Sequence, residues 1–290
     1  MRGLWLVAAF LWLAMPARAD EAAIARGEYM VWAAGCTSCH TDRKNGGASF
    51  AGGLALKTPF GTYYSPNITP DPETGIGDWT DADFLAALKH GRSPEGSHYF
   101  PVFPYTTYTR MHDRDALDIK AYLFSLPPVS HTNRPHDVSP PFSWRWTMAV
   151  WKWLFFTPGE WQDDPERDAE WNRGGYLVEA AAHCGECHTP RNAMGALDAG
   201  KSMAGTVDGP DGELVPNITP HPETGIGSWS QGDIASLLRD GMKPDFDNVQ
   251  GSMGEAIRDG LGKLTEDDLN AIAAYIKALP AIDNKVERQN

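Results

Sequence analysis

The chain contains the stretches Cys36-Thr37-Ser38-Cys39-His40 and Cys184-Gly185-Glu186-Cys187-His188. A Cys-x-x-Cys-His pattern is the attachment signature of a c-type haem, in which both thiols form thioethers with vinyl groups. The histidine that follows lies under the iron and supplies its proximal ligand. All four cysteines of the chain belong to these patterns, which leaves none for disulfides or nucleophilic catalysis. We therefore expect two covalently bound haem c groups, attached through Cys36, Cys39, Cys184 and Cys187, with His40 and His188 as iron ligands.

Paired cysteines also occur in zinc sites and in redox-active disulfides. Two Cys-x-x-Cys pairs could form a four-cysteine zinc site, but both pairs are followed by histidine and they lie farther apart than zinc-binding pairs usually do. A thioredoxin-like redox motif requires a βαβ context, which the flanking sequence does not offer. Haem attachment is the interpretation that the sequence favours.

The N-terminal residues have the features of a secretory signal. Arg2 precedes an apolar stretch from Leu4 to Met15, and Ala17-Arg18-Ala19 follows. This order predicts a signal peptide at residues 1–19, removed after Ala19. The apolar stretch is too short for a membrane span, which needs about 20 residues, although an uncleaved anchor is the alternative. Because haem c is attached outside the bacterial cytoplasm, the expected location is the periplasm.

The chain is acidic, with a formal net charge of −13 at pH 7. Loss of Arg2 and Arg18 with the signal peptide would leave 23 basic and 38 acidic residues, a net charge of −15. This charge disfavours nucleic acid and anionic lipid as partners. It suits docking against a basic patch on a protein, and solubility explains it equally well.

The two halves of the chain are copies of one unit. Residues 67–79 read NITPDPETGIGDW and residues 217–229 read NITPHPETGIGSW, so eleven of thirteen positions are identical. The helix that enters each haem motif and the helix that closes each half repeat as well, which indicates a duplicated domain. We expect an all-α fold of two tandem class I cytochrome c domains. The expected divisions are domain 1 at 20–127, a Pro- and Trp-rich connector at 128–171, domain 2 at 172–282 and a polar tail at 283–290.

Helices are predicted from apolar spacing and from signals at their ends. Leu269, Ile272 and Ile276 recur at helical spacing after Thr265, which is followed three positions on by a carboxylate. Similar signals predict helices before Pro127, after Asp81 and after Ser230. No stretch shows sustained strand alternation, so no strands are expected.

The connector is rich in tryptophan. It contains Trp144, Trp146, Trp151, Trp153, Trp161 and Trp171. Two roles are open for these rings. They could wedge the two domains into a fixed relation, or some could form a docking face for a partner, because Trp is favoured at interfaces.

The sixth iron ligand separates an electron carrier from an enzyme. A haem with His and Met ligands has no vacant position and carries electrons. In the first half, Met111 is the only methionine between the haem motif and the closing helix, and it ends a loop that could wrap the distal side of the haem. We expect Met111 to be the ligand, with His90, His98 and His112 as alternatives.

The second half offers four methionines downstream of its haem motif. Met194 follows the motif too closely, Met203 precedes the Asn-Ile-Thr-Pro loop, and Met242 lies in a turn after a helix. Met253 is therefore the expected ligand, in a loop that crosses the distal face. Met253 does not align with Met111, so the two halves would take this ligand from different positions.

Several polar side chains are candidates for binding the haem propionates, which are buried acceptors that need partners. They are Asn67, Asn217, Trp79, Trp229 and Arg191. Pure turn and core roles are equally open for the asparagines and tryptophans.

The sequence resembles the multihaem cytochrome c subunits of bacterial membrane-bound alcohol, gluconate and aldehyde dehydrogenases. The similar features are the Asn-Ile-Thr-Pro motif in both halves, Pro101 to Met111, Leu126 to Val129 with Asn133 to Pro135, and Glu170 to Asn192. The resemblance implies an electron acceptor for a partner dehydrogenase. Such a protein passes electrons onward to a quinone, a cytochrome or a terminal oxidase.

Those subunits usually carry three haems and a C-terminal membrane-associating segment, whereas this sequence ends at Asn290 in a polar tail. We therefore expect a soluble periplasmic dihaem protein that meets the membrane only through its partners. The expected chemistry is one-electron relay, not catalysis. The alternative is a dihaem enzyme of the peroxidase or thiosulfate-oxidising type, which requires an open or displaceable haem site.

Overall fold

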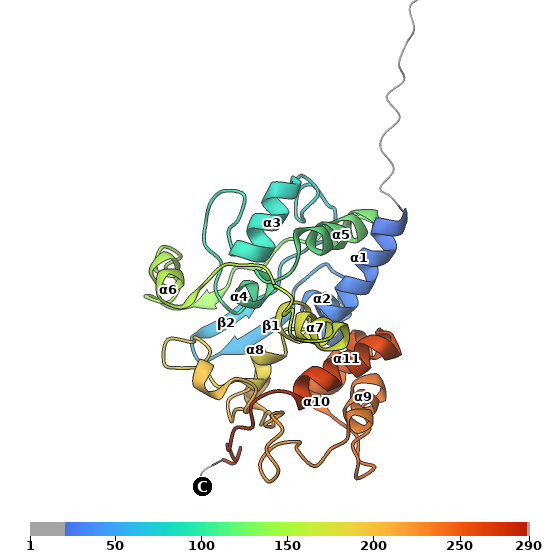
Figure 1. The fold of residues 1–290 in the computed structure, drawn as a ribbon. Coiled ribbons are helices and arrows are strands. Elements are labelled where there is room, and N and C mark those ends of the chain that lie inside the picture. Colours follow the sequence, from blue (N-terminus) through green and yellow to red (C-terminus); the bar gives the residue numbers. More distant parts are fainter. Residues whose placement is uncertain (1–20, 289–290) are drawn as a thin grey trace, which may run out of the picture.

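The computed structural model describes residues 21–288, and Figure 1 shows their arrangement. The predicted signal peptide lies outside the described residues. The N-terminal half forms the upper part of the molecule in this view and the C-terminal half forms the lower part. Within residues 21–288, no helix has both the length and the apolar character that a membrane crossing requires.

The first domain is built around the crossing of its first and last helices. Its elements are α1 (Glu21–Ala33), α2 (Cys36–His40), β1 (Ala55–Thr58), β2 (Gly61–Tyr64), α3 (Asp81–His90), α4 (Tyr105–Tyr108) and α5 (Asp113–Ser125). Helices α1 and α5 approach so closely at Gly27 that a Cβ atom there would lie 1.8 Å from the carbonyl oxygen of Asp118. Arg26 forms an ion pair with the Asp118 carboxylate at 2.6 Å beside this contact.

The second domain repeats this crossing. Its elements are α7 (Ala169–Tyr176), which continues as a π-helical turn (Leu177–Ala181), then α8 (Cys184–His188), α9 (Gln231–Asp240), α10 (Gly251–Asp259) and α11 (Glu266–Lys277). A Cβ at Gly174 of α7 would lie 1.9 Å from the carbonyl oxygen of Ala271 in α11. The ion pair between Arg173 and Asp268, at 2.7 Å, corresponds to the pair in the first domain. The sequence repeat is thus a repeat of one helix crossing.

The predicted helix starts are confirmed by their caps. At the start of α3, the Thr80 hydroxyl accepts a hydrogen bond from the backbone N–H of Asp83, and the Asp83 carboxylate accepts from the backbone of Thr80. This reciprocal capping box satisfies amide groups that a helix end leaves without partners. The same box joins Ser230 to Asp233 at α9, whereas at α11 the Thr265 hydroxyl accepts from the backbone N–H of Asp268 without the reciprocal bond.

A small antiparallel sheet corrects the all-α expectation. Strands β1 and β2 pair with Ala55 opposite Tyr64, and β3 (Asp137–Val138) adds to β2 with Asp137 opposite Thr62. The fold is therefore mostly helical with a three-stranded sheet. Strands of two to four residues are too short to show the alternation by which strands are predicted. Four short 3₁₀ helices complete the described elements, at Arg43–Asn45, Ala199–Lys201, Pro210–Gly212 and Leu261–Lys263.

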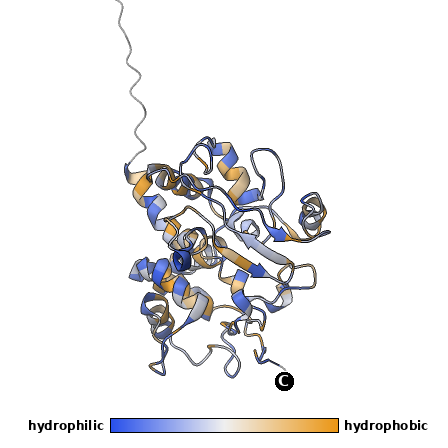
Figure 2. Cartoon of the chain, turned by 180° about the vertical axis from the view of Figure 1, so that it is seen from behind, coloured by the Kyte–Doolittle hydropathy of each residue, from blue (hydrophilic) through white to orange (hydrophobic). Residues whose placement is uncertain are grey.

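One hydrophobic core runs through both domains. Buried residues such as Met30 and Ile119 from the first domain belong to the same cluster as Leu177, Leu269 and Ile272 from the second. Figure 2 shows hydrophobic and hydrophilic residues interspersed along these helices, as expected of helices with one buried side. The shared core holds the two haem motifs in a fixed relation.

The connector tryptophans divide into two groups. Trp151 is buried, and Trp161 and Trp171 pack around Tyr275 of α11 with ring centroids 5.0–6.3 Å apart. These rings pack between the two domains and fix their relation, which is one of the two expected roles. The remaining three, Trp144, Trp146 and Trp153, are exposed, and they lie on or beside α6 (Thr147–Phe155).

Candidate haem sites and their junction

Each haem motif forms one short helix, α2 or α8, and the residue before it has a left-handed backbone. These residues are Gly35, with φ of 62°, and His183, with φ of 43°. The four cysteines form no disulfide. Burial raises the pKa of all four thiols, that of Cys36 to about 12. Two unoxidised thiols three positions apart on one turn fit thioether attachment of a haem.

The histidine of each motif is oriented by a backbone carbonyl. His40 Nδ1 lies 2.8 Å from the carbonyl oxygen of Pro66, and His188 Nδ1 lies 2.8 Å from that of Pro216. Because a carbonyl oxygen only accepts, the proton is on Nδ1 and the lone pair of Nε2 is available to a metal. Burial lowers the pKa of both rings, which favours the neutral form that ligates. This hydrogen bond is the usual outer-shell support of a metal-binding histidine.

The Asn67 side chain fixes the loop that carries the Pro66 carbonyl. It is 1 % exposed, and its amide nitrogen donates to the carbonyl oxygen of Val129 at 2.7 Å and to the Thr74 hydroxyl at 3.0 Å. Its oxygen accepts from the N–H and hydroxyl of Thr69 at 2.9 and 2.7 Å. Every donor and acceptor of the amide has a partner in the described chain.

Asn217 holds the corresponding loop of the second domain. Its amide nitrogen donates to the carbonyl oxygen of Ile282 at 2.8 Å, and its oxygen accepts from Thr219. Both asparagines thus hold the acceptor of the motif histidine in place, and their propionate role stays a prediction. The segments after α5 and α11, which supply Val129 and Ile282, close these loops.

The other propionate candidates lie in different settings. Trp79 and Trp229 are half-buried against the core, and their propionate role stays a prediction. Arg191 is engaged elsewhere, since its guanidinium donates to the carbonyl oxygen of Gly195 and pairs with the Glu186 carboxylate.

Met111 is fully buried, with 0 % of its surface exposed, three residues after the end of α4. It belongs to the shared core. Two of the alternative ligands, His90 and His112, are exposed, and the His112 ring stacks on Tyr176 with centroids 4.7 Å apart. A buried thioether in this position is consistent with the expected distal ligand, and the role of Met111 stays a prediction.

The methionines of the second domain separate by burial. Met194 and Met242 are 52 % and 44 % exposed. Met203 is buried with φ of 60°, like Phe50 with φ of 61° in the first domain, and its N–H donates to the Thr189 hydroxyl as that of Phe50 donates to Thr41. Met203 thus has the place of a residue that binds no metal.

Met253 is the remaining candidate in the second domain. It packs against the core from the first turn of α10, so the structure places it in a helix where a loop was expected. Its role as the distal ligand stays a prediction. A cavity of about 310 Å³ lies beside α8, lined among others by Gly185, Val178 and Met203, and offers room next to the second attachment helix.

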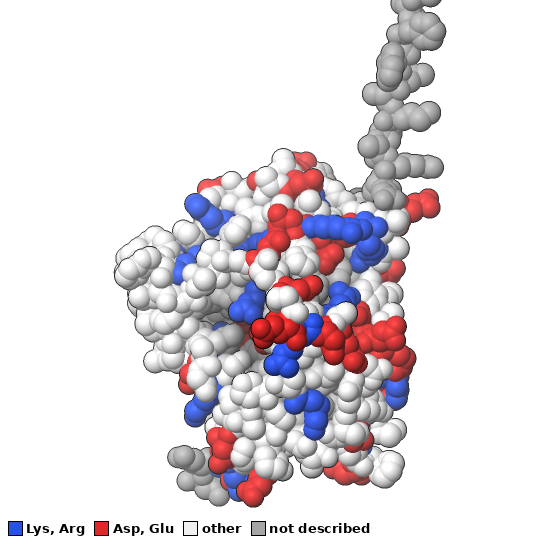
Figure 3. Space-filling view, in the orientation of Figure 1, with Lys and Arg blue, Asp and Glu red and all other residues white. Residues whose placement is uncertain are grey.

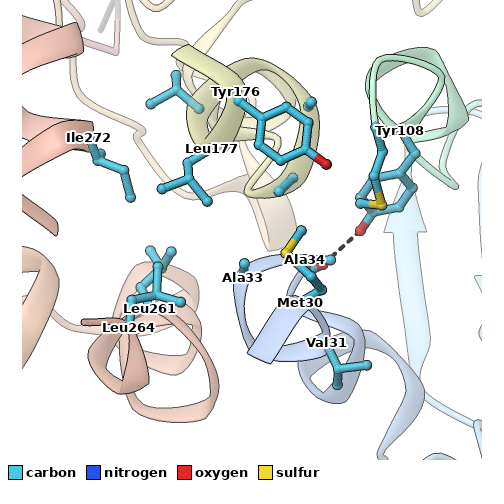
Figure 4. Packing of buried hydrophobic residues seen from close by; sticks show 14 of the residues in the cluster. Met30, Val31, Ala33, Ala34, Tyr108, Tyr176, Leu177, Leu261, Leu264 and Ile272 are labelled. Carbon is cyan, nitrogen blue, oxygen red and sulfur yellow. Dashed lines mark hydrogen bonds between the residues drawn. The ribbon is translucent and has the colours of Figure 1, made fainter. Parts of the chain in front are cut away.

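The segments that lead into the two attachment helices meet at one backbone carbonyl. The Ala34 oxygen accepts a hydrogen bond of 2.7 Å from the Tyr108 hydroxyl, shown in Figure 4, and lies 3.3 Å from His183 Nε2. The rings of Tyr108 and His183 are in edge contact, with centroids 5.5 Å apart. Ala34 lies two residues before Cys36, and His183 directly precedes Cys184. The segments that carry the two haem motifs are therefore in direct contact.

Glu186, inside the second haem motif, holds the same junction. Its side chain is 8 % exposed, and one carboxylate oxygen accepts hydrogen bonds from Thr106 at 2.9 Å and Thr107 at 2.8 Å, both in α4 of the first domain. The other oxygen pairs with Arg191. No local pattern in the sequence marks Ala34, Tyr108, His183 or Glu186, because these contacts join residues far apart in the chain.

The attachment helices, the oriented histidines and the closely packed junction define a c-type cytochrome with two haem sites. The cytochrome c family model matches residues 24–127 and 173–280, so the chain belongs to the cytochrome c family. Its cofactors are two covalently bound haem c groups.

The curated relatives include proteins of similar and of greater length. The chain is 44% identical over 287 residues to a dihaem cytochrome c-type protein of Cereibacter sphaeroides, covering 95% of each chain. It is 39% identical to the cytochrome c subunit of an alcohol dehydrogenase (quinone) of Gluconobacter oxydans, over 91% of this chain and 56% of that one. It is 38% identical to the cytochrome c subunit of a gluconate 2-dehydrogenase of Pantoea cypripedii, over 92% of this chain and 62% of that one. The chain thus spans little more than half the length of these two dehydrogenase subunits.

Proposed function

We propose that this protein relays single electrons in the periplasm, from a partner dehydrogenase to a downstream respiratory acceptor. The observation that carries the proposal is the contact of both attachment segments at the Ala34 carbonyl. The similarity to dehydrogenase cytochrome subunits supports a dehydrogenase as the donor. The acceptor is a cytochrome, a quinone or an oxidase.

The residues of the chain would hold two six-coordinate haem irons and set their reduction potentials. Cys36 and Cys39 attach the first haem and Cys184 and Cys187 the second, and each haem supplies an iron that changes its charge by one electron. The proposed axial ligands are His40 with Met111, and His188 with Met253. The Pro66 and Pro216 carbonyls keep the histidine rings in the ligating tautomer. Burial in the shared core tunes the potential of each site.

A dihaem enzyme would need a different site. A peroxidase requires one iron with an open or displaceable position, and the thiosulfate-oxidising type known to us uses a cysteine there. No cysteine of the chain lies outside the attachment pairs. The relatives are a dihaem cytochrome c-type protein and cytochrome c subunits of dehydrogenases, which favours relay over catalysis.

The test of the proposal is the far-red sulfur-to-iron absorption band of the ferric holoprotein, measured per haem. The band intensity of wild type should correspond to two methionine ligands. Met111→Ala and Met253→Ala should each lose half of this intensity. Met203→Leu, at a buried methionine, and Met242→Ala, at an exposed one, are the matched controls and should keep the full intensity. A wild-type band worth one methionine or none, together with carbon monoxide binding to the reduced protein, would favour the open-site enzyme.

The donor is identified in a second experiment. Antibody against the native chain should retain a dehydrogenase from the periplasmic face of its own cells, and the substrate of that enzyme should reduce both haems in the recovered complex. A dehydrogenase that is retained but leaves both haems oxidised would contradict the relay.

A further inference from the structure

The connector helix α6 has its apolar residues on the outside. Trp146, Val150, Trp153 and Leu154 recur at helical spacing and are 66 %, 52 %, 82 % and 49 % exposed. The buried side of the helix carries Lys152. A surface helix normally shows the reverse arrangement, so the outer side of α6 is not explained by the fold.

The helix is held firmly in this orientation. The Lys152 ammonium donates to the carbonyl oxygens of His90 and Gly91 at 2.6 and 2.7 Å and lies 4.5 Å from the centre of the Tyr105 ring. The Trp151 indole donates to the carbonyl oxygen of Met194 at 2.8 Å. Because the inward side is anchored by its polar groups, α6 cannot rotate to bury its outer residues without breaking these bonds.

The exposed residues continue beyond the helix. Together they form a surface that we call the α6 lobe, made of Phe142, Trp144, Trp146, Val150, Trp153 and Leu154. The rings of Trp144 and Trp146 stack with centroids 6.1 Å apart. Within the described chain, the indole N–H groups of Trp144, Trp146 and Trp153 have no hydrogen-bond acceptor, unlike those of Trp151 and Trp161.

The α6 lobe is uncharged in an acidic protein. Residues 138–159 contain no Asp or Glu, although the whole chain has a net charge of −13. The two cations of this stretch turn inward: Lys152 as described, and Arg145 over the Phe100 ring, with a hydrogen bond to the carbonyl oxygen of His98. In Figure 3 the projection where Figure 1 places α6 is almost entirely white.

We propose that the α6 lobe inserts into the interfacial layer of a lipid bilayer. A projecting surface of aliphatic side chains and tryptophans, with free indole N–H groups for headgroup acceptors, matches the chemistry of that layer. The absence of carboxylates removes the repulsion that the rest of this acidic chain would feel from anionic headgroups. This direct contact departs from the expectation that the protein meets the membrane only through its partners.

The probe is a set of vesicles, of phosphatidylcholine alone and of phosphatidylethanolamine with phosphatidylglycerol. The holoprotein should float with both types, and high salt should not release it, because the attraction is apolar and is not screened. The double variant Val150→Glu/Trp153→Glu should lower the bound fraction at least about tenfold, since burying two carboxylates in the interface is costly. Phe246→Glu is the matched control, because Phe246 is 85 % exposed on another part of the surface, and it should bind like wild type.

The mass of the protein should first show that residues 1–19 are absent, so that they contribute nothing to binding. Haem spectra and thermal unfolding of each variant should match wild type, which shows that the lobe residues are not needed for folding. Wild type that does not float, release by high salt, or equal loss in the Phe246→Glu control would each overturn the proposal. If the double variant instead loses only electron transfer with a dehydrogenase, the lobe is a protein-docking surface and the lipid proposal is wrong.

Discussion

His183 Nε2 lies 3.3 Å from the carbonyl oxygen of Ala34, so the residue that precedes one haem motif touches the segment that leads into the other. Two sites in such contact favour internal electron exchange. Replacing His183 with Asn, which tolerates a left-handed backbone, should slow exchange between the haems without changing the attachment of either. Rapid partial reduction followed by optical relaxation measures the exchange rate. An unchanged rate would show that this contact is not part of the route.

Removal of the Tyr108 hydroxyl should weaken the junction. Tyr108→Phe deprives the buried Ala34 carbonyl of its shorter hydrogen bond, which should lower the free energy of unfolding by about 1–2 kcal/mol. Urea unfolding of the holoprotein gives this value. Tyr64→Phe is the control, since the Tyr64 hydroxyl makes no hydrogen bond to the described chain, and it should change stability by less than about 0.5 kcal/mol.

Asn67→Ala should affect one haem more than the other. It removes the shorter of two hydrogen bonds to the Val129 carbonyl and leaves the Thr69 amide without a partner, at a cost of about 1–3 kcal/mol in unfolding free energy. Movement of Pro66 should also disturb the His40 hydrogen bond and shift the midpoint potential of the first haem, whereas Asn217→Ala should shift the second. Redox titration distinguishes the two. Equal shifts at both haems in either variant would contradict the local role, and the exposed Asn248→Ala should shift neither.

The helix crossings should tolerate no added methyl group. Gly27→Ala and Gly174→Ala would place a Cβ within 2 Å of a backbone carbonyl oxygen, so each should destabilise the protein by about 3 kcal/mol or more. Gly232→Ala in α9 is the control, because the nearest atom would be 3.7 Å away, and it should stabilise by up to about 1 kcal/mol. Thermal unfolding of the three variants checks the order.

Acid should loosen the link between α3 and the connector. The hydrogen bond from Lys89 lowers the pKa of Glu160 to about 2, below its unfolded value of about 4.3. A carboxyl group with a lowered folded pKa stabilises the protein above its unfolded pKa, and this stabilisation is lost as the pH falls from about 4.3 towards 2. Because the Glu160 side chain is 37% exposed, the effect should be below about 1 kcal/mol.

Urea unfolding at pH 5 and pH 3 tests this prediction. The difference in unfolding free energy between the two pH values should be smaller in Glu160→Gln than in wild type. Glu223→Gln, at a surface carboxylate with no ion pair in the described chain, should leave the difference unchanged. A larger difference in Glu160→Gln would mean that the sign of the coupling is wrong.

The sequence predicted the features that have a local pattern. Short stretches of sequence were enough to predict the haem attachment motifs, the duplication and the capped helices at Asp81, Ser230 and Thr265. The family match confirms the attachment motifs and the duplication. The three-stranded sheet was missed because its strands are too short to alternate. Met253 was placed in a loop because its helix, α10, begins without a side-chain cap.

The site residues that were missed act through the backbone or across the domain boundary. The Pro66 and Pro216 carbonyls carry no side-chain signature, although the proline before each Asn-Ile-Thr-Pro motif marks them in retrospect. In the sequence, Glu186 looks like an ordinary surface glutamate. It is a buried hydrogen-bond acceptor because Thr106 and Thr107 of the other domain pack against it.

The residues that follow α5 and α11 close the loops of Asn67 and Asn217. Each copy therefore has, downstream of its last helix, its own segment that closes the loop; this segment is the latch of that copy. The complete domain extends at least to Val129 in the first copy and to Ile282 in the second. A cut at residue 127 would remove the latch along with the linker. The repeating unit therefore consists of the helices together with the segment that follows the last helix. One such unit can be followed by another without a change in its haem pocket.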